Sequence, residues 1–123
     1  DIPDKSKLIG FKKLLNQVEY PCLMHCKSGA DRAGLAAALY LIYKKNYSLK
    51  EASRELNFKH LHIKFTKTGI LDHFFSELIK QGVYKKSDFI KWINKDYNKE
   101  SLKKSFKNNT LLDVLINFFL RRE

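Results

Sequence analysis

The ten residues from His25 to Gly34 read His-Cys-Lys-Ser-Gly-Ala-Asp-Arg-Ala-Gly, and they separate two apolar stretches. The stretch before them, Tyr20–His25, is typical of a short buried strand. The stretch after them, Arg32–Lys45, is rich in Leu and Ala and predicts a helix buried on most sides. The expected order is strand, tight loop and helix start, and the unpaired N–H groups of a helix start attract anions.

Two side chains of this loop have the chemistry needed to bind and attack a phosphate. Cys26 lies where the loop N–H groups and the helix dipole stabilise a thiolate, the nucleophilic form of cysteine. Arg32 follows six positions later and offers a planar guanidinium that can hold two phosphate oxygens. The whole loop is therefore the expected phosphate-binding site. Its phosphate-binding residues are His25, Lys27, Ser28, Gly29, Ala30, Asp31 and Arg32.

The loop resembles the His-Cys-x5-Arg signature of the cysteine-based protein tyrosine and dual-specificity phosphatases, in which Ser or Thr and then Gly usually follow the arginine. The layout from Ile2 to Leu41 is similar to the compact atypical members of bacterial, fungal and plant type. The resemblance implies hydrolysis of phosphate monoesters through a phosphocysteine at Cys26. It implies no metal and no organic cofactor, and it makes phosphorylated proteins the first expected substrates.

The chain departs from the family pattern beside Arg32. Ala33 replaces the Ser or Thr that helps the cysteine leave the intermediate, so we expect slower breakdown of the phosphocysteine. Asp31 precedes the arginine, as in inositol-lipid phosphatases of the myotubularin type, and is one candidate for the catalytic general acid. Asp4 is the other, because compact phosphatases carry a proton donor at about this distance before the cysteine. An aspartate at a helix start is more often only a cap, and the two aspartates remain alternatives.

The resemblance implies an α/β fold with the strand before the loop in the middle of a sheet. We expect one clear central strand, Tyr20–His25, covered mainly by helices, with the N-terminal strands absent from this chain. Residues 1–123 would then form a single phosphatase-like domain that lacks its N-terminal part. A lone strand leaves backbone groups unpaired, so a chain folding by itself would look nearly all-α.

The remaining residues show mainly helical periodicity. Asp4 is expected to cap a helix at Lys5–Gln17, and Ser48 and Ser87 are expected to cap two later helices. Residues 58–67 are interpreted as an extended connector that returns to the rim of the site. Further helices are predicted at Gly69–Lys80, Lys99–Phe106 and Leu111–Arg122.

The two cysteines do not predict a disulfide. Cys22 and Cys26 would lie about 13 Å apart along an extended segment, which is too far for a bridge. Cys22 is expected to be a small core residue. A free reactive thiol indicates a reducing compartment, and with no apolar run long enough to span a bilayer the sequence predicts a cytoplasmic protein.

A net charge of +11 favours phosphorylated substrates, an anionic membrane surface or nucleic acid as partners. Nine lysines against three acids occur in residues 80–107, which we interpret as a solvated helical face. No nucleic-acid-binding motif is recognisable, so no specific nucleic acid is expected. Inositol phosphates or phosphoinositides are the alternative substrates, and phosphate binding without turnover is a further alternative. The sequence leaves the oligomeric state open.

Overall fold

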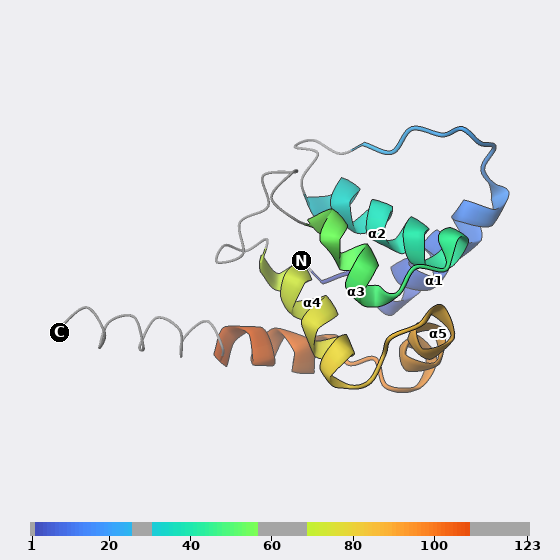
Figure 1. The fold of residues 1–123 in the computed structure, drawn as a ribbon. Helices are drawn as coiled ribbons and strands as arrows, with labels where there is room; N and C mark the ends of the chain where they lie inside the picture. Colours follow the sequence, from blue (N-terminus) through green and yellow to red (C-terminus); the bar gives the residue numbers. More distant parts are fainter. Residues whose placement is uncertain (1, 26–30, 57–68, 109–123) are drawn as a thin grey trace.

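The computed structural model describes residues 2–25, 31–56 and 69–108, which form a helical assembly (Figure 1). Residues 99–108 form the last described helical segment. The other helices, in chain order, are α1 (Lys5–Gln17), α2 (Asp31–Lys45), α3 (Leu49–Ala52), the 3₁₀ helix η1 (Ser53–Leu56), α4 (Gly69–Lys80) and α5 (Lys86–Lys95).

The predicted α/β fold with a central strand at Tyr20–His25 is wrong, since no strand occurs in the described ranges. Residues 20–25 have no regular structure and arc over the outside of the helices between α1 and α2 (Figure 1). Leu23 is 87% exposed, and Cys22 is exposed rather than part of the core as predicted. The physical reason is that a strand needs neighbouring strands for its backbone groups, and the described residues supply none.

Most of the predicted helices, in contrast to the predicted strand, are present in the structure. The bounds of α1 and α4 are those expected, and α2 begins one residue before the predicted start. Ser48 caps α3 as predicted, because its Oγ accepts a hydrogen bond of 3.2 Å from the Glu51 N–H. The predicted helix after Ser48 is divided into α3 and η1. The predicted connector at 58–67 and the helix at 111–122 lie outside the described residues.

The prediction that Ser87 caps α5 is wrong. The helix begins at Lys86, so Ser87 lies within its first turn. The Asp88 carboxylate takes the capping role, accepting hydrogen bonds from the N–H groups of Lys85 at 3.1 Å and Tyr84 at 3.4 Å. A carboxylate in the first turn also interacts favourably with the positive end of the helix dipole, which favours this earlier start.

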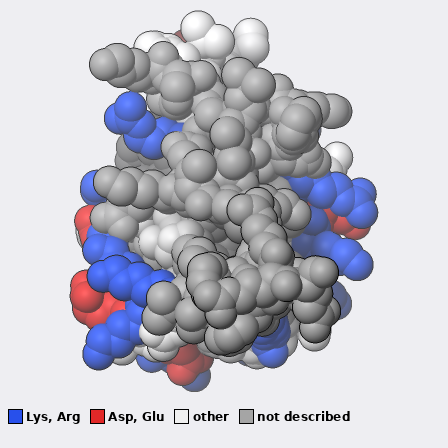
Figure 2. Space-filling view, turned by 90° about the vertical axis from the view of Figure 1, so that its left-hand side faces the viewer, with Lys and Arg blue, Asp and Glu red and all other residues white. Residues whose placement is uncertain are grey.

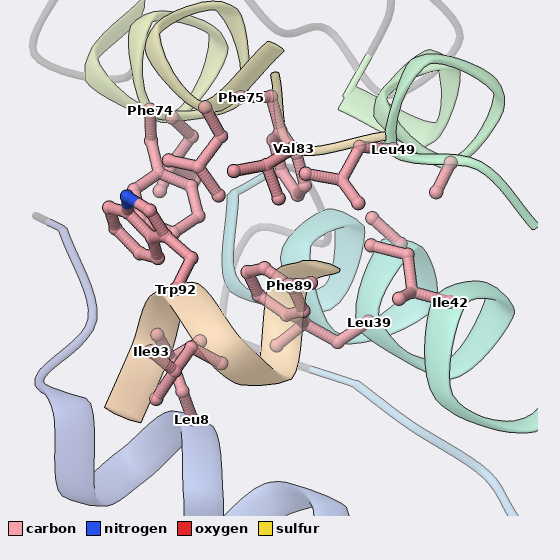
Figure 3. Packing of buried hydrophobic residues seen from close by; sticks show 14 of the residues in the cluster. Leu8, Leu39, Ile42, Leu49, Phe74, Phe75, Val83, Phe89, Trp92 and Ile93 are labelled. Atoms are coloured by element: carbon pink, nitrogen blue, oxygen red, sulfur yellow. The ribbon is translucent and has the colours of Figure 1, made fainter. Parts of the chain in front are cut away.

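The hydrophobic core lies between the helices, with aromatic rings at its centre (Figure 3). Phe74 of α4 packs edge-on against Phe75 and against Trp92 of α5, with ring centroids 5.3 and 5.9 Å apart. Phe89 of α5 faces Leu39 of α2 in the same cluster (Figure 3). The aromatic residues of α5, Phe89 and Trp92, are therefore part of the core.

Helix α2 follows the loop and is fixed by the core. Its side chains Ala38, Leu39, Ile42 and Tyr43 are buried. The Tyr43 hydroxyl donates a hydrogen bond of 3.2 Å to the Leu8 carbonyl on α1. Burial raises the pKa of Tyr43, so the phenol remains a neutral donor. These contacts hold the middle and the last turn of α2 against the core and α1. The first turn of the same helix carries the arginine of the signature.

Candidate active site

Arg32 is the residue of the signature that the structure places most clearly. It lies in the first turn of α2 with an exposed side chain. Within the described part of the chain, no carboxylate forms an ion pair with its guanidinium. The guanidinium is therefore accessible to an anion, as the predicted phosphate-binding role requires.

Gly34, the last residue of the signature, has a packing role. A Cβ atom at this position would lie 3.3 Å from the Glu55 carbonyl oxygen and 3.3 Å from Leu56 Cδ2. Both contacts are with η1, so the absence of a side chain lets η1 pack closely against the start of α2. Ala33, between Arg32 and Gly34, is half-buried. The glycine of the signature thus helps to hold the arginine-bearing turn in place.

Asp4, one of the two candidate acids, is the N-cap residue of α1 as predicted, but its side chain forms ion pairs and no cap hydrogen bond. Its carboxylate lies 2.7 Å from Lys99 Nζ and 3.7 Å from Lys7 Nζ, and its side chain makes no cap hydrogen bond. The hydrogen bond and the charge of Lys99 lower the pKa of Asp4 below its usual value, with a smaller contribution from Lys7. A general acid must hold its proton at the working pH, so this arrangement favours the carboxylate form and weakens the case for Asp4 as donor.

A second contact ties the N-terminal residues to the short turn between α5 and the last described helical segment. The Tyr97 hydroxyl donates a hydrogen bond to the Pro3 carbonyl. Burial raises the pKa of Tyr97 to about 12, so the donor stays protonated at neutral pH. With the Asp4–Lys99 ion pair, this contact holds the residues that lead into α1.

A pocket of about 340 Å³ lies between α1 and the first turns of α2. Arg32, Lys7 and Lys99 line it together with apolar residues of α1, α2 and the N-terminal segment. Lys7 and Lys99 were not among the predicted site residues. Lys99 is 95 positions from Asp4, and no pattern in a single sequence links residues so far apart.

Other predicted site residues are described only in part or not at all. His25 is exposed at the end of the irregular segment 20–25. Asp31 is the first residue of α2, and its side chain is not described. Cys26, Lys27, Ser28, Gly29 and Ala30 lie outside the described residues. The structure thus brings Arg32 together with Lys7 and Lys99, while the roles of the loop residues remain predictions.

One face of the molecule carries many cationic side chains at its edges. Figure 2 shows Lys and Arg side chains along both edges of the face on the left of Figure 1, with fewer acidic side chains among them.

Among the described residues, no group of three His, Cys, Asp or Glu side chains could hold a metal ion. The helices in the same ranges are all too short or too polar to cross a bilayer.

The comparison with protein families agrees with the signature. Residues 4–43 match the model of the tyrosine phosphatase family, from the start of α1 through the signature to Tyr43 of α2. Searches of curated proteins and of solved structures found no match to the chain. The family match suggests phosphatase activity. It also supports the resemblance: residues 4–43, about a third of the chain, are similar to a protein tyrosine phosphatase-like family.

Proposed function

We propose that the chain hydrolyses phosphate monoesters through a phosphocysteine intermediate at Cys26. The observation that carries this proposal is the accessible Arg32 guanidinium in the first turn of α2, six positions after Cys26 within the family-matched segment. A guanidinium and a helix N-terminus together suit the oxygens of a phosphate.

The reaction has two steps. The Cys26 thiolate attacks phosphorus, the ester P–O bond breaks, and the leaving oxygen takes a proton from a general acid. Water then attacks the phosphocysteine, so that inorganic phosphate leaves and the thiolate is restored. In both steps Arg32 and the loop N–H groups hold the non-bridging oxygens, where charge develops in the transition state.

The proton donor is Asp4 or Asp31, and the same residue would later accept the proton of the attacking water. Asp4→Asn and Asp31→Asn distinguish the two, because only loss of the true donor removes the basic limb of the pH–rate profile. A profile unchanged in both variants would exclude both aspartates.

The first expected substrates are phosphotyrosine and phosphoserine or phosphothreonine in proteins. The tyrosine phosphatase family match is in line with the first of these, and the other two follow from the resemblance of the loop to dual-specificity phosphatases. A catalytic thiolate needs a reducing environment, so we expect the protein to act in the cytoplasm. The oligomeric state is left open.

The experiment that tests the function compares two cysteine substitutions in hydrolysis of phenyl phosphate. Cys26→Ser should abolish hydrolysis, because a serine hydroxyl is not ionised at neutral pH. Cys22→Ser is the matched control, since Cys22 is exposed and four positions away, and this variant should retain the activity. Hydrolysis that survives Cys26→Ser would refute the assignment.

Inositol phosphates or phosphoinositides are a second candidate class, favoured by the cations Lys7 and Lys99 beside Arg32. Several phosphates on one ligand would use these cations and an anionic membrane surface better than one phosphate does. Phosphate binding without turnover is the third candidate, favoured by Ala33. Activity on a panel of phosphopeptides and inositol phosphates separates the first two, and vanadate binding without hydrolysis of any substrate identifies the third.

A further inference from the structure

The pocket beside Arg32 is lined by three cationic side chains and by an apolar wall. Apart from Lys7, Arg32 and Lys99, every lining residue that the structure describes is apolar. The apolar lining residues that carry the argument are Ile2, Leu8, Phe11, Leu35, Ala36 and Leu39. A volume of about 340 Å³ is within the range of sites for small organic ligands. The pocket can therefore accept an organic group and not only a phosphate.

The charges at this pocket favour an anion. Lys7 and Lys99 both pair with the Asp4 carboxylate, and Arg32 forms no ion pair with a carboxylate of the described ranges. Three cations and no acidic side chain are among the described residues that line the pocket, so positive charge is in excess next to an apolar wall. The complementary ligand has an anionic head and an apolar body.

The wall also discriminates between organic groups. Its described residues offer no neutral hydroxyl or amide side chain, so the hydroxyls of an inositol ring buried against them would lose hydrogen bonds to water without replacement. An alkyl chain gains from the same burial. Within the proposed function, the wall therefore favours an aliphatic alcohol over a polyol.

We propose that this pocket holds the alkyl chain of an amphiphilic phosphate monoester, a phosphorylated aliphatic alcohol, whose phosphate is bound at Arg32. The inference rests on the proposed function for the position of the phosphate. The inference goes beyond the proposed function because it names the organic part of the substrate and the residues that contact this part.

Binding of n-alkylphosphonates to the full chain tests this inference, because their C–P bond is not hydrolysed. We expect affinity to rise from methyl- to octylphosphonate by up to about fourfold per methylene until the pocket is filled. Octylphosphonate should bind more tightly than phenylphosphonate and inositol 1-phosphate. Affinities that do not depend on chain length, or tighter binding of either ring compound, would overturn the inference.

Two substitutions on α2 locate the effect. Ala36→Phe fills the pocket and should remove the dependence of affinity on chain length. Ala37→Phe is the matched control, since Ala37 is the neighbouring helix residue and does not line the pocket, and it should preserve the dependence. If either phenylalanine variant fails to fold, Ala36→Leu and Ala37→Leu make the same comparison. Chain-length dependence that survives in the Ala36 variants would overturn the inference.

Failure of the alkyl-pocket inference and failure of the proposed function give different results in these experiments. Loss of phenyl phosphate hydrolysis in Cys26→Ser with no chain-length effect supports the phosphatase and overturns the alkyl pocket. A chain-length effect removed by Ala36→Phe supports the alkyl pocket, even if Cys26→Ser still hydrolyses phenyl phosphate and the proposed function fails.

Discussion

The Asp4 carboxylate lies 2.7 Å from the Lys99 ammonium, and this ion pair joins the start of α1 to the start of the last described helical segment. The two residues are 95 positions apart. The pair keeps Lys99 beside the pocket that Arg32 lines, and it holds Asp4 in its ionised form. One contact thus links the fold, the charge of the pocket and the choice of general acid.

The ion pair predicts a pH dependence of stability. The pKa of Asp4 is lowered in the folded protein, so the ionised carboxylate stabilises the fold. This stabilisation is complete above the ordinary pKa of 3.8 and is lost as the pH falls through the lower pKa of the folded protein. Lys99→Met should lower the melting temperature at pH 6, and its difference from wild type should vanish in strong acid. Thermal unfolding between pH 2 and pH 7 checks this.

Lys104→Met is the matched control for that measurement, because Lys104 is an exposed lysine of the same helical segment. Its melting temperature should follow that of the wild type throughout. A Lys99→Met difference that stays constant down to pH 2 would show that the charge of Asp4 is not what Lys99 stabilises.

The sequence predicted the helices well because their apolar residues recur with helical period, as in α4, where Phe74, Phe75 and Leu78 are buried. It failed at Tyr20–His25, because apolar character identifies residues that can be buried but not whether a neighbouring strand exists to bury them. The position of Arg32 at the start of a helix could be predicted, because the Leu- and Ala-rich stretch after the loop is local in the sequence. The ion pair of Asp4 with Lys99 could not, since contacts over long separations in sequence leave no periodic signal.

The core packing predicts a large cost for Leu78→Ala. Leu78 is fully buried, so the substitution should lower the free energy of unfolding by about 2–5 kcal/mol through lost burial and a new cavity. Leu14→Ala removes the same atoms from a side chain that is 49% exposed, and it should change that free energy by less than about 1 kcal/mol. Urea denaturation measures both. Equal costs would contradict the assigned core.

The close approach of α2 and η1 predicts different effects for two glycine substitutions. Gly10 is in the middle of α1 with open space around it, so Gly10→Ala should raise the free energy of unfolding by about 0.5–1 kcal/mol. At Gly34 the new methyl group would press on Glu55 and Leu56, so Gly34→Ala should be at least about 1 kcal/mol less favourable. An equal gain at both positions would mean that η1 does not constrain the signature glycine.

The alanine after Arg32 predicts the kinetics of the intermediate. Ala33→Ser would supply the hydroxyl that the cysteine-based phosphatases, which the loop resembles, use to help the cysteine leave the phosphocysteine. We expect faster breakdown of the intermediate, and therefore a smaller burst of phenol relative to the steady-state rate. Rapid-quench kinetics with phenyl phosphate measures this, and a larger burst in Ala33→Ser would contradict the role assigned to this position.

The most direct test of the central claim is to trap the phosphorylated protein. The wild-type chain is mixed with phenyl phosphate, quenched within the burst, digested and analysed by mass spectrometry. The account predicts one phosphate on the sulfur of Cys26, a lower yield of it in Arg32→Lys, and none in Cys26→Ser. Phosphate on another residue, or turnover without any phosphorylated cysteine, would contradict it.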